Sequence, residues 1–231
     1  MDGSTPKIHN ALRQMPNALT KVKKAIKLAK EKGFEIHTET TITKLNQNNI
    51  PQIIELAKKL GVDYFFIRSI VVAGCAEKNL MITKEEYKKA LETVYKAKYP
   101  LGKMKITSQD PLFHLVDKKL MQKLENKYGD IYSGKYVGGC SAGLNSLNIK
   151  SDGSVKLCSF LTQDLGNIRF KKLKEIWKNK NKICKDIISR NIQGKCKICK
   201  DKLICGGCRA RANILTNNIL GEDPYCWKKI N

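Results

Sequence analysis

The sequence has few acidic residues, few arginines, only three histidines and no long hydrophobic run. No apolar stretch approaches the ~18 residues that a membrane-spanning helix needs. The first ten residues, MDGSTPKIHN, lack the apolar core of a signal peptide. We therefore expect a cytoplasmic protein with no membrane partner. Hydrophobic residues at 42% and charged residues at 28% of the 231 positions exclude wholesale disorder.

The shortage of acidic residues leaves a formal charge of +23, from 44 Lys plus Arg against 21 Asp plus Glu. Such an excess is found in nucleic-acid-binding proteins. Here it comes mostly from lysine, without a dense arginine stripe, and aromatic residues make up only 7% of the chain. We interpret the charge as solvated helix faces in a lysine-rich proteome, which argues against nucleic acid as a partner.

Histidine is absent from the second half of the chain, whereas cysteine is concentrated there. Residues 1–135 contain only Cys75, and the other eight of the nine cysteines follow Gly139. An odd number of cysteines in a reducing compartment argues against a disulfide framework and favours metal binding.

The spacing of these cysteines suggests more than one metal centre. Cys140 and Cys158 are followed by C-x2-C-x5-C-x2-C (Cys196, Cys199, Cys205, Cys208) and then by Cys226. Seven organised cysteines exceed the four ligands of a single zinc site, whereas iron–sulfur clusters commonly take four thiolates each. A zinc-binding interaction module stays open as the alternative without redox chemistry.

The first half alternates helix and strand signals. We expect helices over 17–32, 49–60 and 83–98, strands over 34–43 and 62–72, and a short strand over 103–107. The apolar run VDYFFIRSIVV predicts a strand buried on both faces of a parallel sheet. A connecting helix is expected over 111–128, a turn-rich boundary over 129–139, a hairpin around Asp152 and a short helix over 170–179.

The run from Cys140 to Cys226 resembles the SPASM domain of radical S-adenosylmethionine enzymes. That domain has the pattern C-x(9–15)-G-x4-C, a gap, C-x2-C-x5-C-x(2–3)-C and a final Cys. The stretches GCSAGLNSLNIKSDGSVKLCSF, CGGCRARA and EDPYC fit it. The resemblance implies two auxiliary [4Fe–4S] clusters, one held by Cys140, Cys158 and Cys208, the other by Cys196, Cys199, Cys205 and Cys226.

The first of these clusters then lacks a fourth protein ligand. Its remaining iron would be open, bind substrate, or take Cys184 or Cys75. For Cys184 and Cys75 we favour the role of a small buried hydrophobic residue. Arg209 and Arg211 either offset the cluster charge or lie on the surface, and Asp152 is interpreted as a turn former.

The front half resembles the end of the radical S-adenosylmethionine barrel. Asp2-Gly3 with His9 and Arg13, then TTITKLN and FFIRSIVVAG, are similar to segments from the fourth strand onwards. The expected architecture is α/β: the C-terminal half of a partial (β/α)6 barrel over 1–110, a linker over 111–137 and the cluster domain over 138–231. The resemblance implies S-adenosylmethionine contacts at Asp2, Thr41, Asn46 and Arg68.

The family's C-x3-C-x2-C motif, which binds the cluster that cleaves S-adenosylmethionine, is absent from this sequence. We therefore assign no catalytic residue. Three alternatives stay open: the chain is half of a split enzyme, a shortened remnant of an enzyme, or a stand-alone electron relay. A half-barrel partner polypeptide, or self-association through an exposed sheet edge, would allow S-adenosylmethionine binding, and a redox partner is expected.

In a completed barrel, a 5′-deoxyadenosyl radical would abstract hydrogen from a peptide or tetrapyrrole. CGGCRARA and EDPYC resemble the haem-biosynthesis branch and its archaeal relatives, whereas Ser159 departs from the sulfatase-maturing pattern.

Overall fold

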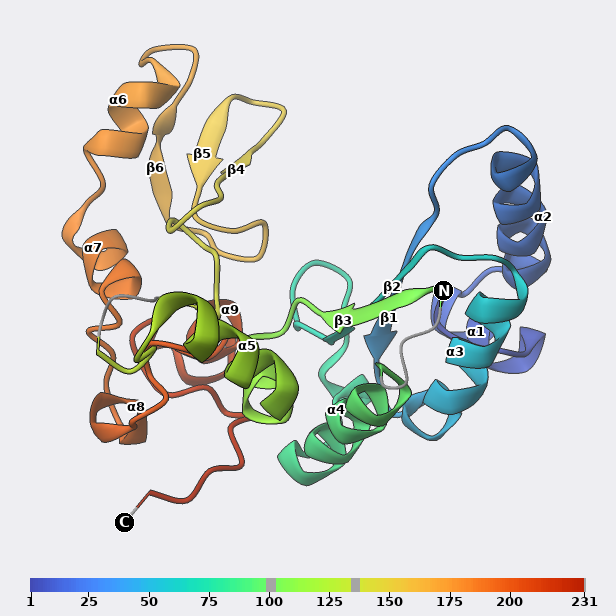
Figure 1. Cartoon of the computed structure of the whole chain (residues 1–231). Coiled ribbons are helices and arrows are strands. Elements are labelled where there is room, and N and C mark those ends of the chain that lie inside the picture. Colours follow the sequence, from blue (N-terminus) through green and yellow to red (C-terminus); the bar gives the residue numbers. More distant parts are fainter. Residues whose placement is uncertain (99–102, 134–137, 231) are drawn as a thin grey trace. The chain divides into compact units, whose positions relative to one another are not determined.

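The computed structural model describes residues 1–98, 103–133 and 138–230. The chain divides into two compact units (Figure 1). Unit 1 comprises Met1–Ile70 and Cys75–Val116, and unit 2 comprises Val71–Gly74 and the chain from Asp117 onwards. None of the helices in the described ranges has the length and apolar character needed to cross a bilayer.

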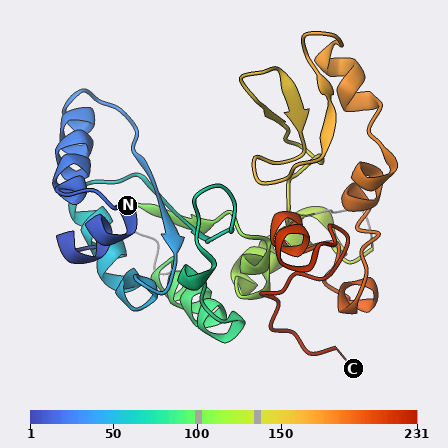
Figure 2. The same ribbon diagram turned by 180° about the vertical axis from the view of Figure 1, so that it is seen from behind.

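Unit 1 is built on a parallel three-stranded sheet in the order β1 (His37–Ile42), β2 (Tyr64–Ser69) and β3 (Lys105–Ser108). Parallel neighbours need crossover connections, which α3 (Ile50–Lys59) and α4 (Lys84–Lys98) provide. The remaining elements of unit 1 are α1 (Pro6–Arg13), α2 (Ala18–Glu31), η1 (Gln47–Asn49), η2 (Lys78–Leu80) and η3 (Pro111–Leu115). Figure 2 shows the same arrangement from behind.

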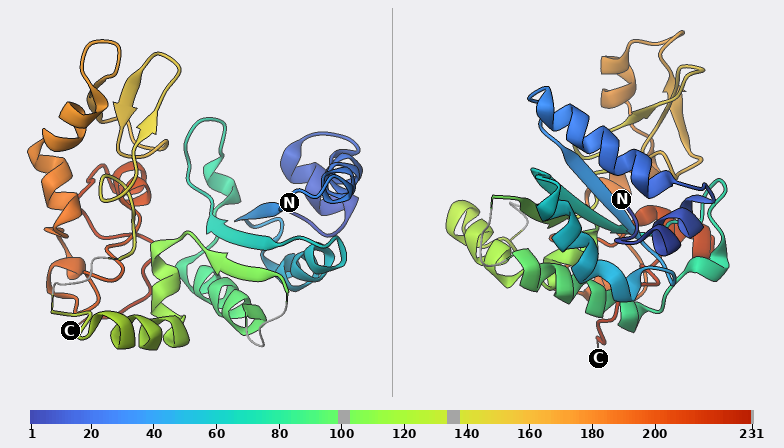
Figure 3. Two further views of the ribbon diagram at one scale, coloured as in Figure 1. Left: turned by 45° about the horizontal axis from the view of Figure 1, so that its top comes forward. Right: turned by 90° about the vertical axis from the view of Figure 1, so that its right-hand side faces the viewer.

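Only one face of the sheet is fully buried. Phe65 and Ile67 of β2 are 0% exposed, whereas Tyr64, Phe66 and Arg68, which alternate with them, are only partly buried. The prediction of a strand buried on both faces is therefore wrong. Helices α3 and α4 pack against one another, α4 contacts β3, and in the left view of Figure 3 the two helices lie below the strands.

Most of the expected helices are confirmed, including their ends. Helix α4 begins at the predicted capping box, where Thr83 N–H donates to Glu86 at 2.8 Å and Glu86 N–H donates to Thr83 Oγ1 at 3.1 Å. The single helix expected over 111–128 is wrong. It is split into η3 and α5 (Lys118–Tyr128) because Asp110 and Asp117 each cap a separate helix start.

Unit 2 contains a small antiparallel sheet and several short helices. The sheet contains β4 (Asn148–Ile149), β5 (Ser154–Lys156) and β6 (Asp164–Asn167). The predicted hairpin is confirmed, and Asp152 shapes its turn by accepting from Ser154 N–H at 2.9 Å. Helix α6 (Leu173–Lys178) contacts β6, and the other helices are α7 (Lys182–Ile188), α8 (Lys195–Ile198) and α9 (Arg209–Thr216). Of the boundary expected over 129–139, residues 134–137 lie outside the described ranges.

Candidate metal centre

Three of the predicted ligands share one apolar surface in unit 2. Cys140, Cys158 and Cys208 are partly buried and pack against a core cluster that includes Leu157 and Ile187. They come from three distant parts of the chain: the segment after the boundary, the end of the hairpin and the start of α9. The fold therefore brings the three cysteines predicted for the first cluster to a common core.

The cysteines predicted for the second cluster lie in a more buried environment. Burial raises the pKa of Cys196, and the nearby thiols of Cys226 and Cys199 raise it further. Burial likewise raises the pKa of Cys226, and Cys199 adds to the increase. Cys205 is also buried, and its Sγ accepts the Gly207 N–H at 3.3 Å. Within residues 1–98, 103–133 and 138–230, no three Cys, His, Asp or Glu side chains converge as metal ligands. The ligand sets therefore stay predictions.

The turn between Cys205 and Cys208 requires its two glycines. Gly206 and Gly207 have φ values of +61° and +59°, a left-handed conformation that strains any side chain. A Cβ at Gly206 would lie 2.5 Å from Arg190 Nε, and one at Gly207 would lie 2.8 Å from Arg209 Nη2. The turn thus brings the backbone directly against two arginine side chains.

These arginines are buried. Arg190 is 1% exposed and Arg209 is 0% exposed. Arg190 Nε and Arg209 Nε and Nη2 are buried N–H donors for which no acceptor is found in the described part of the chain. A buried unsatisfied donor is costly, and more so on a charged group. Such donors indicate a site for an acceptor with negative charge.

Arg211 is buried as well, but it is paired. It is 2% exposed and its guanidinium binds the Asp223 carboxylate. The alternative that Arg209 and Arg211 lie on the surface is therefore wrong. Helix α9 follows Cys208 directly and turns both side chains into the interior of unit 2.

The residues present fit an iron–sulfur cluster. Seven thiols, without histidine nearby in the sequence, form a donor set that suits iron and sulfide. The unsatisfied arginine donors supply the positive charge and the N–H groups that an anionic cluster accepts. Burial raises the pKa of the Cys196 and Cys226 thiols, so both thiols keep their protons until a metal replaces them.

The two remaining cysteines differ from each other. Cys184 is 1% exposed in the core cluster, and burial raises its pKa, as suits a small hydrophobic residue. Cys75 is exposed, so the expectation of a buried residue is wrong for it. It follows Gly74, whose φ of +62° turns the chain after β2.

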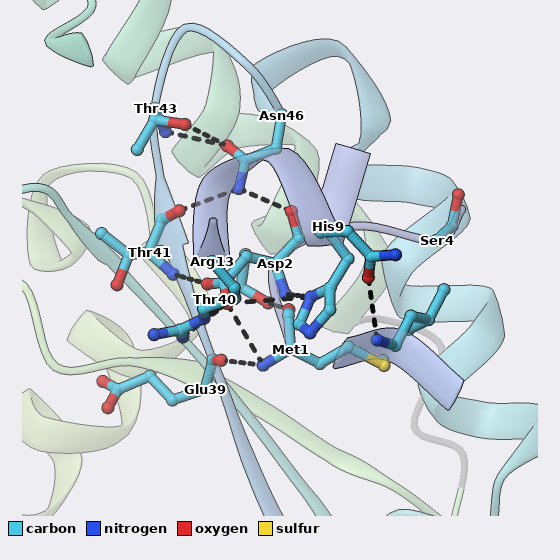
Figure 4. Close-up of polar contacts among 12 residues, drawn as sticks. Met1, Asp2, Ser4, His9, Arg13, Glu39, Thr40, Thr41, Thr43 and Asn46 are labelled. Carbon is cyan, nitrogen blue, oxygen red and sulfur yellow. Dashed lines mark hydrogen bonds and ion pairs between the residues drawn. The ribbon is translucent and has the colours of Figure 1, made fainter. Parts of the chain in front are cut away.

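In unit 1, three of the four predicted S-adenosylmethionine contacts lie together (Figure 4). Asp2, 0% exposed, accepts from Thr41 N–H at 2.9 Å and from Arg13 Nε at 2.8 Å. The Asn46 amide donates to the carbonyls of Asp2 and Thr41 at 3.0 and 2.9 Å, and its Oδ1 accepts from Thr43 N–H at 2.8 Å. These bonds give Asp2 and Asn46 a structural role. Their contact with S-adenosylmethionine stays a prediction.

His9 and Arg13 lie one turn apart on α1 and reach Asp2 together (Figure 4). The Asp2 N–H donates to His9 Nδ1 at 2.9 Å, so the proton of the neutral ring is on Nε2. Burial lowers the pKa of His9, although the Asp2 carboxylate opposes that effect. The fourth candidate, Arg68, lies on β2 opposite Thr41 in the strand register, but no hydrogen bond to Asp2, Thr41 or Asn46 is found for it in the described part of the chain. It pairs with Glu39 on the neighbouring strand and donates to Gln109 at 3.1 Å.

One residue of the centre escaped prediction. Arg190 follows α7 and is 50 residues from Cys140 in sequence, yet its Nη2 donates to the carbonyls of Gly138 and Cys140. No local sequence pattern distinguishes it, because a single arginine after a helix is usually interpreted as a cation that stabilises the C-terminal end of that helix. Arg190 has a φ of +58°, which is unusual for a residue other than glycine, and only the structure reveals this.

Known proteins resemble this chain both in the region of the cysteines and along almost its whole length. Residues 140–208 match the family model SPASM, an iron–sulfur cluster-binding domain. The AdoMet-dependent heme synthase of Methanosarcina barkeri is 30% identical over 233 residues, covering 98% of this chain and 65% of that protein. The Oleidesulfovibrio alaskensis protein of the same name is 26% identical over 230 residues, covering 98% of this chain and 59% of that protein.

The fold has matching solved structures. Native anSMEcpe with bound AdoMet superposes with a TM-score of 0.69 at 22% identity, covering 98% of this chain and 62% of that one. SuiB of Streptococcus suis gives a TM-score of 0.66 at 16% identity, covering 99% and 52%. Along its length the chain is similar to radical S-adenosylmethionine proteins, and residues 140–208 match the SPASM domain that such proteins carry. The chain spans less than two thirds of the length of these relatives.

Proposed function

We propose that this chain contributes the last strand–helix units of a radical S-adenosylmethionine barrel and a SPASM domain with two auxiliary [4Fe–4S] clusters. The first cluster takes Cys140, Cys158 and Cys208. The second takes the remaining predicted ligands, which are Cys196, Cys199, Cys205 and Cys226. The observation that carries the proposal is the burial of Arg190 and Arg209 beside these cysteines, with unsatisfied N–H donors.

The auxiliary clusters, when bound, supply one-electron transfer or an iron at which substrate is anchored. The chain's own contribution is to hold the thiols in a buried, positively charged surrounding that excludes water. The C-x3-C-x2-C motif is absent from the sequence, so we propose that a partner polypeptide contributes it and completes the barrel. S-adenosylmethionine would then contact unit 1 near Thr41 and Arg68, and a redox partner would deliver electrons.

For the substrate we propose a tetrapyrrole. The support is the similarity over 98% of the chain to a protein named AdoMet-dependent heme synthase. A peptide is the second candidate, since anSMEcpe has been solved with a bound peptide and shares the fold. The residue after Cys158 is Ser159, where the sulfatase-maturing pattern has aspartate, and this favours the tetrapyrrole.

Metal analysis tests the clusters. Anaerobic reconstitution with iron and sulfide should load about eight iron and eight acid-labile sulfide ions per chain and produce broad absorbance near ~400 nm. Cys208→Ala and Cys226→Ala should each lose about half of the iron. Cys184→Ala is the matched control and should keep all of it. Zinc without sulfide would overturn the proposal in favour of a zinc module.

A binding titration tests the substrate class. Iron protoporphyrin, added to the reconstituted chain together with the motif-bearing partner, should bind saturably and displace no iron. Saturable binding of a cysteine-containing peptide, without porphyrin binding, would assign the substrate to the peptide class. A loaded chain whose complex binds no S-adenosylmethionine would instead be an electron relay.

A further inference from the structure

Two buried cations in unit 2 share the turn between Cys205 and Cys208. Arg190 donates three hydrogen bonds to backbone carbonyls: Nη1 donates to Ile187 O at 3.1 Å, and Nη2 donates to Gly138 O and to Cys140 O, the latter at 2.9 Å. Arg190 Nε has no acceptor in the described ranges. It points at Gly206, where an added Cβ would lie 2.5 Å away.

Arg209 has the same arrangement. Its Nη1 donates to the carbonyls of Ile219 and Gly221, at 2.9 and 2.6 Å, while Nε and Nη2 have no acceptor in the described part of the chain. Its Nη2 lies against Gly207, since an added Cβ there would be 2.8 Å away. The unsatisfied donors of two buried arginines thus lie along one short turn between two predicted ligands.

The charges in this region do not balance without a further anion. Asp223 pairs with Arg211, and within the described residues no carboxylate is paired with Arg190 or Arg209. Burial lowers the pKa of the Arg190 guanidinium, and the nearby Arg209 cation lowers it further. An isolated buried cation is strongly unfavourable, so a buried anion is expected beside the two arginines. Two [4Fe–4S]2+ cores with seven thiolates carry a charge of roughly −3.

We propose that Arg190 and Arg209 are the positioning residues that compensate the charge of the auxiliary clusters and set their reduction potential. This inference rests on the proposed function. The backbone bonds fix each guanidinium, and the free N–H groups face the bound cluster or its thiolates. A fixed cation next to a cluster stabilises the reduced form, which is more negative by one charge, and therefore raises the potential.

The test is an EPR-monitored redox titration of the anaerobically reconstituted protein. Arg190→Gln and Arg209→Gln should each shift a midpoint potential to more negative values. Arg190→Lys and Arg209→Lys keep the charge and should stay close to the wild-type value. Arg169→Gln, which removes an exposed cation just after β6 of the same unit, is the control and should leave the potential unchanged.

The outcomes separate the two proposals. A wild-type chain that takes up no iron and sulfide contradicts the proposed function itself. Loaded Gln variants with the wild-type potential contradict only the role of the arginines. If the Gln variants load no iron, the Lys variants decide: loading at the wild-type potential supports charge compensation. Lys variants that lose the iron as completely as the Gln variants overturn it, because the guanidinium would then act only through its shape.

Discussion

Asp223 and Arg211 form a buried ion pair, with Nε to Oδ1 at 3.0 Å and Nη2 to Oδ2 at 2.6 Å. The same carboxylate accepts from Cys208 N–H at 2.7 Å and from Tyr225 N–H at 3.0 Å. One side chain therefore ties Cys208, the N-cap of α9, to the segment that carries Cys226. These two cysteines are assigned to different clusters, so the pair links the two proposed ligand sets.

The first prediction concerns this pair. Asp223→Asn leaves Arg211 charged and unpaired in the interior, so it should destabilise the protein by about 3–5 kcal/mol. Urea unfolding of the reconstituted protein under anaerobic conditions measures the effect. Asp164→Asn removes an exposed carboxylate from the same unit and should change stability by less than about 0.5 kcal/mol. Equal effects of the two variants would show that the pair contributes no net stability.

The second prediction uses two glycines with nearly the same positive φ. Gly139 and Gly129 have φ values of +73° and +75°, but only a Cβ at Gly139 would clash, at 1.7 Å from Cys205 O. Gly129 has φ of 75° and ψ of −148°, a conformation that essentially only glycine adopts, so Gly129→Ala should cost about 1–3 kcal/mol for the backbone alone. Gly139→Ala should also push Cys140 and Cys205 apart and reduce the iron content after reconstitution. Iron contents that agree between the two variants would disprove this role for the contact.

The third prediction concerns unit 1. Asn46→Ala removes a buried amide that bonds Asp2, Thr41 and Thr43, and leaves their backbone groups unsatisfied. It should destabilise unit 1 by about 1–3 kcal/mol, as seen by thermal unfolding. Asn48→Ala, at an exposed position two residues later, should have little effect. An Asn46→Ala protein with unchanged stability would favour a role in ligand contact alone.

The fourth prediction is a pH dependence from His9. Burial lowers its pKa in the folded protein below the ordinary 6.5, so the unfolded chain binds the proton more readily. The stability contributed by neutral His9 is complete above pH ~6.5 and is lost as the pH falls below that value. His9→Asn should flatten the decline of the melting temperature between about pH 6.5 and 5. His37→Asn, at an exposed histidine, should retain the wild-type slope, and a wild-type slope in His9→Asn would refute the assignment.

The sequence was a good guide where a local signal decides the structure. The capping box at Thr83 and Glu86 and the turn at Asp152 form as predicted, since each is satisfied by hydrogen bonds within a few residues. The break between η3 and α5 was missed, although Asp117 is itself a capping residue. The prediction of one helix followed the helical pattern over 111–128 and passed over the capping signal at Asp117.

Features that depend on distant parts of the chain could not be predicted. The partial exposure of Tyr64 and Phe66 depends on what covers each face of the sheet, which an apolar run does not specify. The burial of Arg209 and Arg211 depends on how α9 packs against the segment around Asp223. Arg190 is separated by 50 residues from the Cys140 carbonyl that it binds. The choice of the seven cysteine ligands was drawn from a family resemblance and stays a prediction.

The link through Asp223 also has a consequence for assembly. Asp223 holds both cysteines, because its carboxylate accepts from Cys208 N–H and its carbonyl accepts from Cys226 N–H. Filling one cluster and docking the C-terminal segment therefore become one cooperative event. A chain caught between the two would expose that segment to proteases, so trimming of the C-terminus would report incomplete loading.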